Sequence, residues 1–361
     1  MVTNIESRKW SDLAIPPGEL LEEELAAVGM TQQELATRAG RPVQVVNEII
    51  RGKKAITHDT ALEFEKVLGI PAHVWVNLES AYQLTLAKNK ERESLRNQEE
   101  WLSEFPVEEL EKREWIQKYS DKSDTVRALL EYLGVASFQA WRQAIVGLRV
   151  SAGSKVSLGA LAIWMRRGEI AARDLQTEPY DEGHFRQALS SIRSMTSDHP
   201  KSFLPQMTRL CAEAGVVFVV IRELPKSGAN GVARWLTPEK ALIQMSLRWR
   251  WSDVFWFSFF HEACHILSHR VRQVYINGVD GEPQVEAEAD RFSRDFLVPL
   301  DAWVDFVNAG QRSPMDIRNF AKGLGIDAGI VVGRMQHEKL IPYKQMTSLK
   351  RRFIWKEDSE G

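Results

Sequence analysis

Residues 260–266, FHEACHI, decide how the second half of the chain folds and what it can do. They end an apolar run, VFWFSFF at residues 254–260, that lacks glycine and proline and is typical of a buried helix. On a helix, His261 and His265 project from one face, where both imidazoles can bind one metal ion. Glu262 beside them can take a proton from water, so the pattern predicts zinc-dependent hydrolysis. The same residues also occur by chance on helices, so the motif alone leaves a structural reading open.

A third metal ligand is predicted in EAEADRFSRDFLVP, residues 286–299. Its apolar residues recur at helical spacing, and the proline marks the end of the helix. Glu286 and Asp290 share one face, so Glu286 can bind the metal while Asp290 accepts the free ring N–H of a ligand histidine. Glu288 points elsewhere and is the second choice. Three protein ligands with one open position are typical of a catalytic zinc site.

Other metal-binding residue types near the motif fit less well. His269 continues the four-residue series, but about 12 Å of helical rise separates it from His261, too far to share an ion. We expect it to cap the helix or to line a pocket. The two cysteines, Cys211 and Cys264, do not form pairs at zinc-ribbon spacing, and Cys264 is expected to be a small core residue.

The two separated motifs together resemble the signature of ImmA/IrrE metallopeptidases, whose relatives cleave repressor proteins. The resemblance covers about the second half of the chain and implies a zincin-like domain. It implies that His261, His265 and Glu286 bind zinc, with Glu262 as general base and Asp290 as a supporting residue. Ser293 stands where alanine is usual in that family.

The N-terminal segment predicts a compact bundle of short helices. Thr31 is followed three residues later by Glu34, which predicts a capping box, and the helix that it opens ends at Gly40. PVQVVNEII, residues 42–50, follows after a short turn, with small Ala36 where the two helices cross. Two short helices joined by a tight glycine turn are typical of a helix-turn-helix, whose second helix enters the major groove of DNA.

The candidates for contact with double-stranded DNA lie in or next to these two helices and are polar or basic apart from one valine: Gln32, Gln33, Arg41, Val43, Gln44, Asn47, Arg51, Lys53 and Lys54. Gln44 and Asn47 can read base edges, and Val43 can touch a thymine methyl. The basic members supply positive charge for phosphates. A helical bundle with a solvated basic face is the structural alternative.

The N-terminal segment is also similar to HigA-type antitoxins, helix-turn-helix regulators of the XRE class that repress their own operon. The similarity lies in the runs PPGELLEEEL, GMTQQELATRAG and VNEIIRGKKAITHDTALEFEKVLGIPAHVWVNLESAY. It implies operator DNA as a partner and a homodimer formed through the apolar stripe from Ala72 to Leu86, although this stripe could simply pack on the bundle. Relatives usually begin the second helix with Ser or Thr, whereas this chain has Arg41-Pro42, and proline suits a first helical turn.

Length, composition and net charge limit the classes of protein to which this chain can belong. The chain has 361 residues, which suits two or three domains, and its 44% hydrophobic and 27% charged residues are ordinary for a globular protein. A net charge of −2 means that DNA binding must rest on a local basic patch. No run has the length of a membrane span, and residues 1–8 lack the apolar core of a signal peptide. We therefore expect a cytoplasmic protein that does not contact membranes.

The expected fold is mainly α with a small antiparallel sheet (α+β). Residues 1–86 are predicted to form the helix-turn-helix domain, 87–195 a helical connector and 196–361 the metallopeptidase domain. Within the last part, a helical subdomain is expected at about 310–345. The β-branched run at 216–221 and the segments 233–236 and 241–246 are the expected strands, with a turn at 237–240.

These expectations combine into a DNA-binding regulator or antitoxin with a zinc-dependent endopeptidase domain. Such a protein would control its own operon and cleave a repressor or toxin partner. Two alternatives remain open. In one, the peptidase-like half only senses or binds a partner; in the other, the DNA-binding half only localises a protease.

Overall fold

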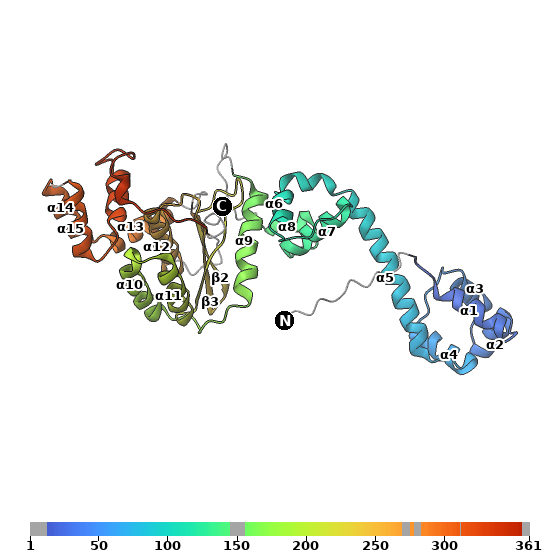
Figure 1. Cartoon of the computed structure of the whole chain (residues 1–361). Helices are drawn as coiled ribbons and strands as arrows, with labels where there is room; N and C mark the ends of the chain where they lie inside the picture. The colour runs from blue at the N-terminus through green and yellow to red at the C-terminus, as the bar shows by residue number, and fades with distance from the viewer. Residues whose placement is uncertain (1–12, 145–155, 269–274, 278–282, 311, 356–361) are drawn as a thin grey trace. The chain divides into compact units, whose positions relative to one another are not determined.

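The computed structural model describes residues 13–144, 156–268, 275–277, 283–310 and 312–355 (Figure 1). Their contacts group the chain into two compact units, Met1–Glu100 with Tyr119–Arg127, and Trp101–Lys118 with Ala128–Gly361. The predicted boundary at residue 86 falls inside a single continuous helix, Ala72–Arg96. None of the helices within the described ranges has both the length and the apolar character that a bilayer crossing requires.

The first unit is a bundle of helices. Its helices are α1 (Pro17–Ala27), α2 (Gln32–Ala39), α3 (Val43–Ile50), α4 (His58–Leu68) and α5 (Ala72–Arg96). Leu21, Leu35, Val46, Phe64 and Trp75 are fully buried at its centre. Trp75 and Phe64 meet edge to face, with ring centroids 5.7 Å apart. The apolar stripe of α5 therefore begins by packing on the bundle.

Local capping sets the ends of α2. Thr31 accepts a hydrogen bond from the backbone N–H of Glu34 at 3.2 Å, as a helix N-cap does. The Glu34 side chain was expected to reach back to Thr31, but it pairs with Arg38 one turn on, at 2.7 Å. Gly40 ends the helix with φ of 67°, a left-handed conformation that glycine adopts without steric cost.

The second unit is built from helices around one sheet. Its helices are α6 (Val107–Lys112), α8 (Phe138–Ala144), α9 (Leu158–Arg173), α10 (Glu182–Ser194), α11 (Pro200–Glu213), α12 (Ser252–Ser268), α13 (Pro283–Leu297), α14 (Leu300–Asn308), α15 (Pro314–Leu324) and α16 (Ala328–His337). The helix α7 (Lys122–Leu133) has residues in both units, as does the short 3-10 helix η1 (Glu99–Glu104). Two more 3-10 turns, η2 (Met195–Ser197) and η3 (Thr347–Leu349), belong to the second unit.

The sheet is mixed rather than antiparallel. Its strands are β1 (Val216–Val220), β2 (Gly231–Thr237), β3 (Lys240–Met245) and β4 (Tyr275–Asn277), in the order β1-β3-β2-β4. The tight turn after Thr237 makes β2 and β3 an antiparallel hairpin, and β4 pairs antiparallel with β2. The chain between β1 and β2 stays at the edge of the sheet where β1 ends, because Val220 and Gly231 both lie opposite Met245. Strand β3 then runs between them, parallel to β1. The expectation of an antiparallel sheet was wrong for this pair, because single-strand periodicity does not reveal strand direction.

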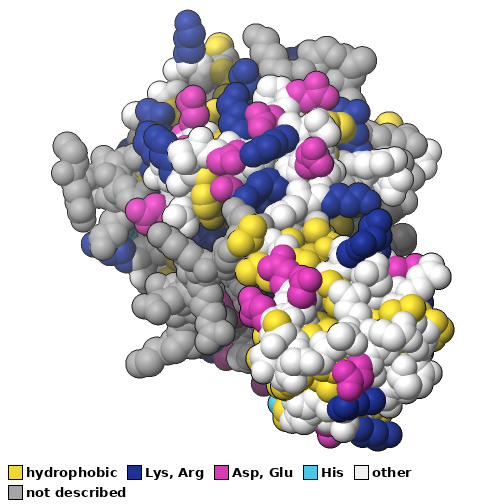
Figure 2. Space-filling view, turned by 90° about the vertical axis from the view of Figure 1, so that its right-hand side faces the viewer, with side chains coloured by type: hydrophobic (Ala, Val, Ile, Leu, Met, Phe, Trp, Pro, Cys, Tyr) yellow, Lys and Arg dark blue, Asp and Glu magenta, His cyan; other side chains and the backbone are white. Residues whose placement is uncertain are grey.

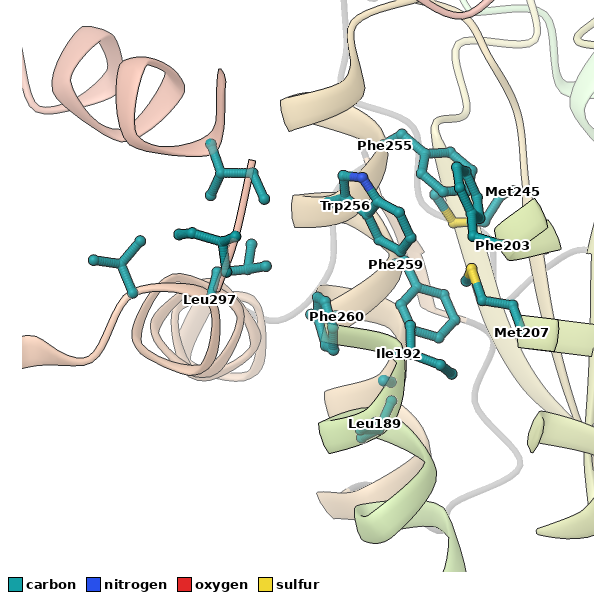
Figure 3. Close-up of a cluster of buried hydrophobic side chains, with 14 of the residues drawn as sticks. Leu189, Ile192, Phe203, Met207, Met245, Phe255, Trp256, Phe259, Phe260 and Leu297 are labelled. Atoms are coloured by element: carbon teal, nitrogen blue, oxygen red, sulfur yellow. The ribbon is translucent and has the colours of Figure 1, made fainter. Parts of the chain in front are cut away.

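Aromatic side chains of α12 fill the core on one side of the sheet. Phe255, Trp256 and Phe259 are buried beside Phe203 of α11, and the rings of Phe203 and Trp256 lie 4.7 Å apart (Figure 3). Helices α10, α11 and α12 cover this side, while α9 packs against β1 and β3 on the other (Figure 1). The packing fixes the rotation of α12 about its axis, and so fixes the directions of the polar residues that follow Phe260.

Candidate metal centre and nucleic-acid interface

The last two turns of α12 carry the histidines of the motif. His261 is 2% exposed and His265 is 1% exposed, and their ring centroids lie 4.8 Å apart. Because one helical turn separates them, the rings project from the same face, toward α13. Burying two imidazoles side by side is costly unless their nitrogens have partners. The partners come from α13.

Three donor atoms from α12 and α13 form a small triangle. His261 Nε2 lies 3.1 Å from His265 Nε2 and 3.2 Å from Glu286 Oε2. His265 Nε2 lies 3.6 Å from Glu286 Oε1, a buried oxygen that accepts no hydrogen bond from any described residue. Donor atoms about 2.0–2.1 Å from a tetrahedral zinc ion are themselves about 3.3 Å apart. The residues present therefore fit a zinc ion that retains one open position.

Asp290 holds the other side of the His261 ring. Its Oδ1 lies 2.9 Å from His261 Nδ1, which leaves His261 Nε2 to face the triangle. Burial lowers the pKa of His261, but the hydrogen bonds to Asp290 and Glu286, together with the charge of Glu262, outweigh it and raise the pKa to about 10. A site that holds a proton this strongly is one where positive charge is stabilised, as a divalent cation would be.

Glu262 is fully buried and reaches the sheet at the start of β2. A Cβ atom built on Gly231 would lie 2.8 Å from both Glu262 Cγ and Glu262 Oε1. Only a residue without a side chain leaves room for this carboxylate. Gly231 therefore shapes the candidate site, although the sequence did not single it out; a glycine two residues before the strand predicted at 233–236 was the available signal.

Glu288 and Cys264 are two further residues near the motif. Glu288 is exposed and lies outside the cluster of His261, His265 and Glu286. Cys264 is 1% exposed, and burial raises its pKa to about 11, so it is a protonated core thiol. His269 lies outside the described residues. A cavity of about 230 Å³ borders Asp290 and is lined by residues of α12, α13 and α16.

The predicted DNA contacts gather around α2 and α3. Asn47 donates a hydrogen bond to Gln32 at 3.1 Å, which ties the two helices together through their polar side chains. Gln44 is exposed and donates to Glu48 one turn on, at 3.0 Å. The other exposed members of the predicted set are Gln33, Val43, Arg51, Lys53 and Lys54. Exposed side chains at the start of α3, with basic residues following its end, suit contact with a DNA groove and its phosphates.

Arg41 differs from the other basic residues. Its guanidinium binds Glu63 of α4 through two hydrogen bonds, of 2.6 Å and 3.1 Å. This paired arginine links the turn before α3 to the rest of the bundle, so its positive charge is already offset. Arg51, Lys53 and Lys54, by contrast, are exposed.

In the face of the molecule that Figure 2 shows, dark-blue Lys and Arg side chains are interspersed with magenta Asp and Glu side chains. This mixture agrees with the net charge of −2. Recognition of an anionic partner must therefore depend on particular basic residues.

Comparisons with known proteins concern the first unit. Residues 21–75 match the family model described as helix-turn-helix. The chain is 40% identical over 76 residues to virulence-associated protein I of Dichelobacter nodosus, a match that spans 21% of this chain and 70% of that protein. An addiction module antidote protein of the HigA family from Coxiella burnetii is 35% identical, with 23% of this chain and 92% of that one covered and a TM-score of 0.22. Antitoxin HigA of Pseudomonas aeruginosa, solved with the higBA promoter, is 28% identical, with 24% and 94% covered and a TM-score of 0.23.

Proposed function

The chain belongs to the helix-turn-helix family through residues 21–75, and from this premise we propose that its N-terminal domain binds double-stranded operator DNA. The domain resembles HigA antitoxins, one of which was solved with its promoter. In this proposal α3 enters the major groove, where Gln44 and Asn47 read base edges and Val43 contacts a thymine methyl. Arg51, Lys53 and Lys54 bind phosphates and supply most of the salt-dependent affinity.

A dimer fits this role, because two copies read two half-sites related by two-fold symmetry. Trp75 is buried in its own bundle and cannot contribute to a dimer contact, whereas Leu84 and Leu86 further along α5 are 50% and 40% exposed. The proposed homodimer therefore uses the C-terminal part of the stripe. In this dimer the second copy covers Leu84 and Leu86, which are exposed to water in a single copy.

We further propose that the second unit is a zinc-dependent endopeptidase resembling the ImmA/IrrE family. The convergence of His261, His265 and Glu286 donor atoms supports this proposal. These three residues would hold the ion, and Asp290 would orient His261. Zinc bound there would supply Lewis acidity and would make water more acidic.

The protein's own residues would handle the protons of peptide hydrolysis. The Glu262 carboxylate accepts a proton from the attacking water and passes it to the amine that leaves as the peptide bond breaks. Gly231 leaves the space in which this carboxylate is held.

The proposed protein is thus a regulator of its own operon that cleaves a protein partner such as a repressor or a toxin. A second candidate is a DNA-binding antitoxin whose metal-binding half senses or binds a partner without cleaving it. The convergence of the same three donor atoms supports this second candidate as well, because metal binding does not require cleavage.

Substitution of Glu262 distinguishes between these two candidate functions. Full-length Glu262→Gln should retain the metal and still repress an operator reporter. New protein N-termini that appear in cells expressing the wild type should be absent with this variant. If wild type and variant give the same set of N-termini, the metal site does not cleave proteins and the second candidate stands.

A further inference from the structure

A basic cavity lies on the side of the sheet opposite the metal centre. Its volume is about 480 Å³, and it is formed by α9, the second half of β2 and the first residue of β3. Alternation along β2 explains the separation: Ala233 faces the core around α12, while Arg234 and Leu236 face α9. The cavity therefore uses residues that the proposed peptidase does not.

Positive charge in this cavity exceeds negative charge. Its basic side chains are Arg166, Arg173, Arg234 and Lys240, and Glu169 is the only carboxylate among the described residues that line it. Both oxygens of Glu169 are already used, since Oε1 lies 2.6 Å from Arg234 and Oε2 pairs with Arg166. One carboxylate thus pairs with both Arg166 and Arg234, and no other carboxylate among the described residues that line the cavity is available to Arg173 or Lys240.

Among the four cations of the cavity, Arg234 is the one most affected by the excess of positive charge. Its side chain is 10% exposed, and its remaining terminal nitrogen donates to the carbonyl oxygen of Met165 at 2.8 Å. Burial lowers the pKa of Arg234, Glu169 raises it, and the neighbouring charge of Arg166 lowers it again. A buried cation beside a second cation is stabilised when an anion lies nearby.

The two further cations of the cavity, Lys240 and Arg173, are able to bind such an anion. Lys240 Nζ donates to the carbonyl oxygens of Ala172 and Leu175, at 3.0 Å and 2.7 Å, which leaves one N–H available. Arg173 is exposed and forms no ion pair within the part of the chain that the structure describes. Leu236 adds apolar surface to the same wall.

We propose that this cavity binds a small molecule carrying a phosphate or pyrophosphate group. The anion lies between Arg173 and Lys240, close enough to offset the charges of Arg166 and Arg234, and the apolar wall contacts the rest of the molecule. Guanidinium and ammonium groups bind phosphate oxygens through short charge-assisted hydrogen bonds. A concave site beside a sheet fits a compact ligand better than a nucleic-acid duplex, whose phosphates need an extended basic track.

Calorimetric titration of the full-length protein with inorganic pyrophosphate at fixed ionic strength tests the proposal. Arg173→Glu should weaken binding by about tenfold or more, the effect expected for losing a charged hydrogen bond. Lys240→Gln should weaken it in the same direction. Arg209→Glu, on α11 and 61% exposed, changes the net charge equally and should leave the affinity unchanged.

Pyrophosphate also chelates metals, so the titration is repeated on protein treated with EDTA, and the affinity should not change. Absence of binding to the wild type would overturn the proposal, as would equal weakening by Arg173→Glu and Arg209→Glu. Duplex DNA binding that depends on Arg173, without pyrophosphate binding, would replace the small molecule with a nucleic acid. Pyrophosphate binding that disappears with EDTA would assign the ligand to the metal centre instead.

Discussion

Gly231 lies directly against Glu262, so that any Cβ at position 231 would come within 2.8 Å of the Glu262 side chain. The two residues come from the first position of β2 and from the middle of α12. A missing side chain on the sheet thus creates the space for a buried carboxylate on the helix. The position of the proposed general base depends on this contact as much as on the HExxH motif.

Gly231→Ala is therefore expected to displace Glu262 while leaving the metal in place. The backbone of β2 is paired on both sides, to β3 and β4, and cannot easily move away. Displacement of a catalytic group by about 1 Å can cost roughly a hundredfold in rate. Cleavage should fall by that order, with metal content unchanged by elemental analysis.

Gly323→Ala is the matched control. No atom lies within 4 Å of a Cβ at this position in α15. Alanine in a helix interior is favoured over glycine by up to about 1 kcal/mol, so stability should stay the same or rise. A Gly231→Ala protein that cleaves as fast as Gly323→Ala would show that the contact with Glu262 does not matter.

Asp290→Asn should weaken zinc binding. The substitution keeps the shape of the side chain but removes the charge that holds His261 Nδ1 at 2.9 Å. Loss of such a supporting carboxylate typically costs 10- to 100-fold, that is roughly one to two orders of magnitude, in metal affinity. Competition with a fluorescent zinc chelator measures the change. Glu288→Gln, exposed on the same helix, serves as control, and an equal loss in both variants would argue against a specific role for Asp290.

The stability of the metal-free protein should depend on pH through His261. The pKa of this histidine is raised to about 10 in the folded chain, above the value of about 6.5 expected when unfolded. Its contribution is therefore fully present below about pH 6.5 and is lost as the pH rises through about 10. Denaturant unfolding of EDTA-treated wild type and His261→Gln across this range should show a difference that shrinks with rising pH. A difference that grows would contradict the assignment.

Much of the fold follows from local patterns. The end of the helix at Gly40 was predictable because caps and glycine stops act over a few residues. The predicted metal residues His261, His265 and Glu286 are brought together because helical periodicity fixes each face in advance. Periodicity alone does not place these two helices side by side, because that depends on the packing of α12 against α13.

Other features depend on contacts between distant segments. The parallel pairing of β1 with β3, the ion pair of Arg41 with Glu63 and the space at Gly231 each join residues that no short window contains. The basic cavity beside α9 is a further case, since α9 and β2 contribute its cations separately. Such features appear only when the chain is assembled in three dimensions.

Two classes of substitution should affect DNA binding differently. Lys53→Ala removes an exposed charge and should lower affinity for all sequences, reducing the slope of log affinity against log salt by about one. Gln44→Ala removes the proposed base contact and should relax specificity at one position, by about 1–3 kcal/mol. Fluorescence anisotropy with operator and scrambled duplexes at several salt concentrations distinguishes the two. Identical effects on both duplexes would contradict base reading by Gln44.

Metal content tests the central claim most directly. Protein purified without added zinc is analysed for bound metals, beside a His261→Ala variant treated identically. The account predicts about one equivalent of zinc in the wild type and its loss in the variant, because three protein ligands form the site. A wild-type protein that contains no metal, even after incubation with zinc and desalting, would contradict it.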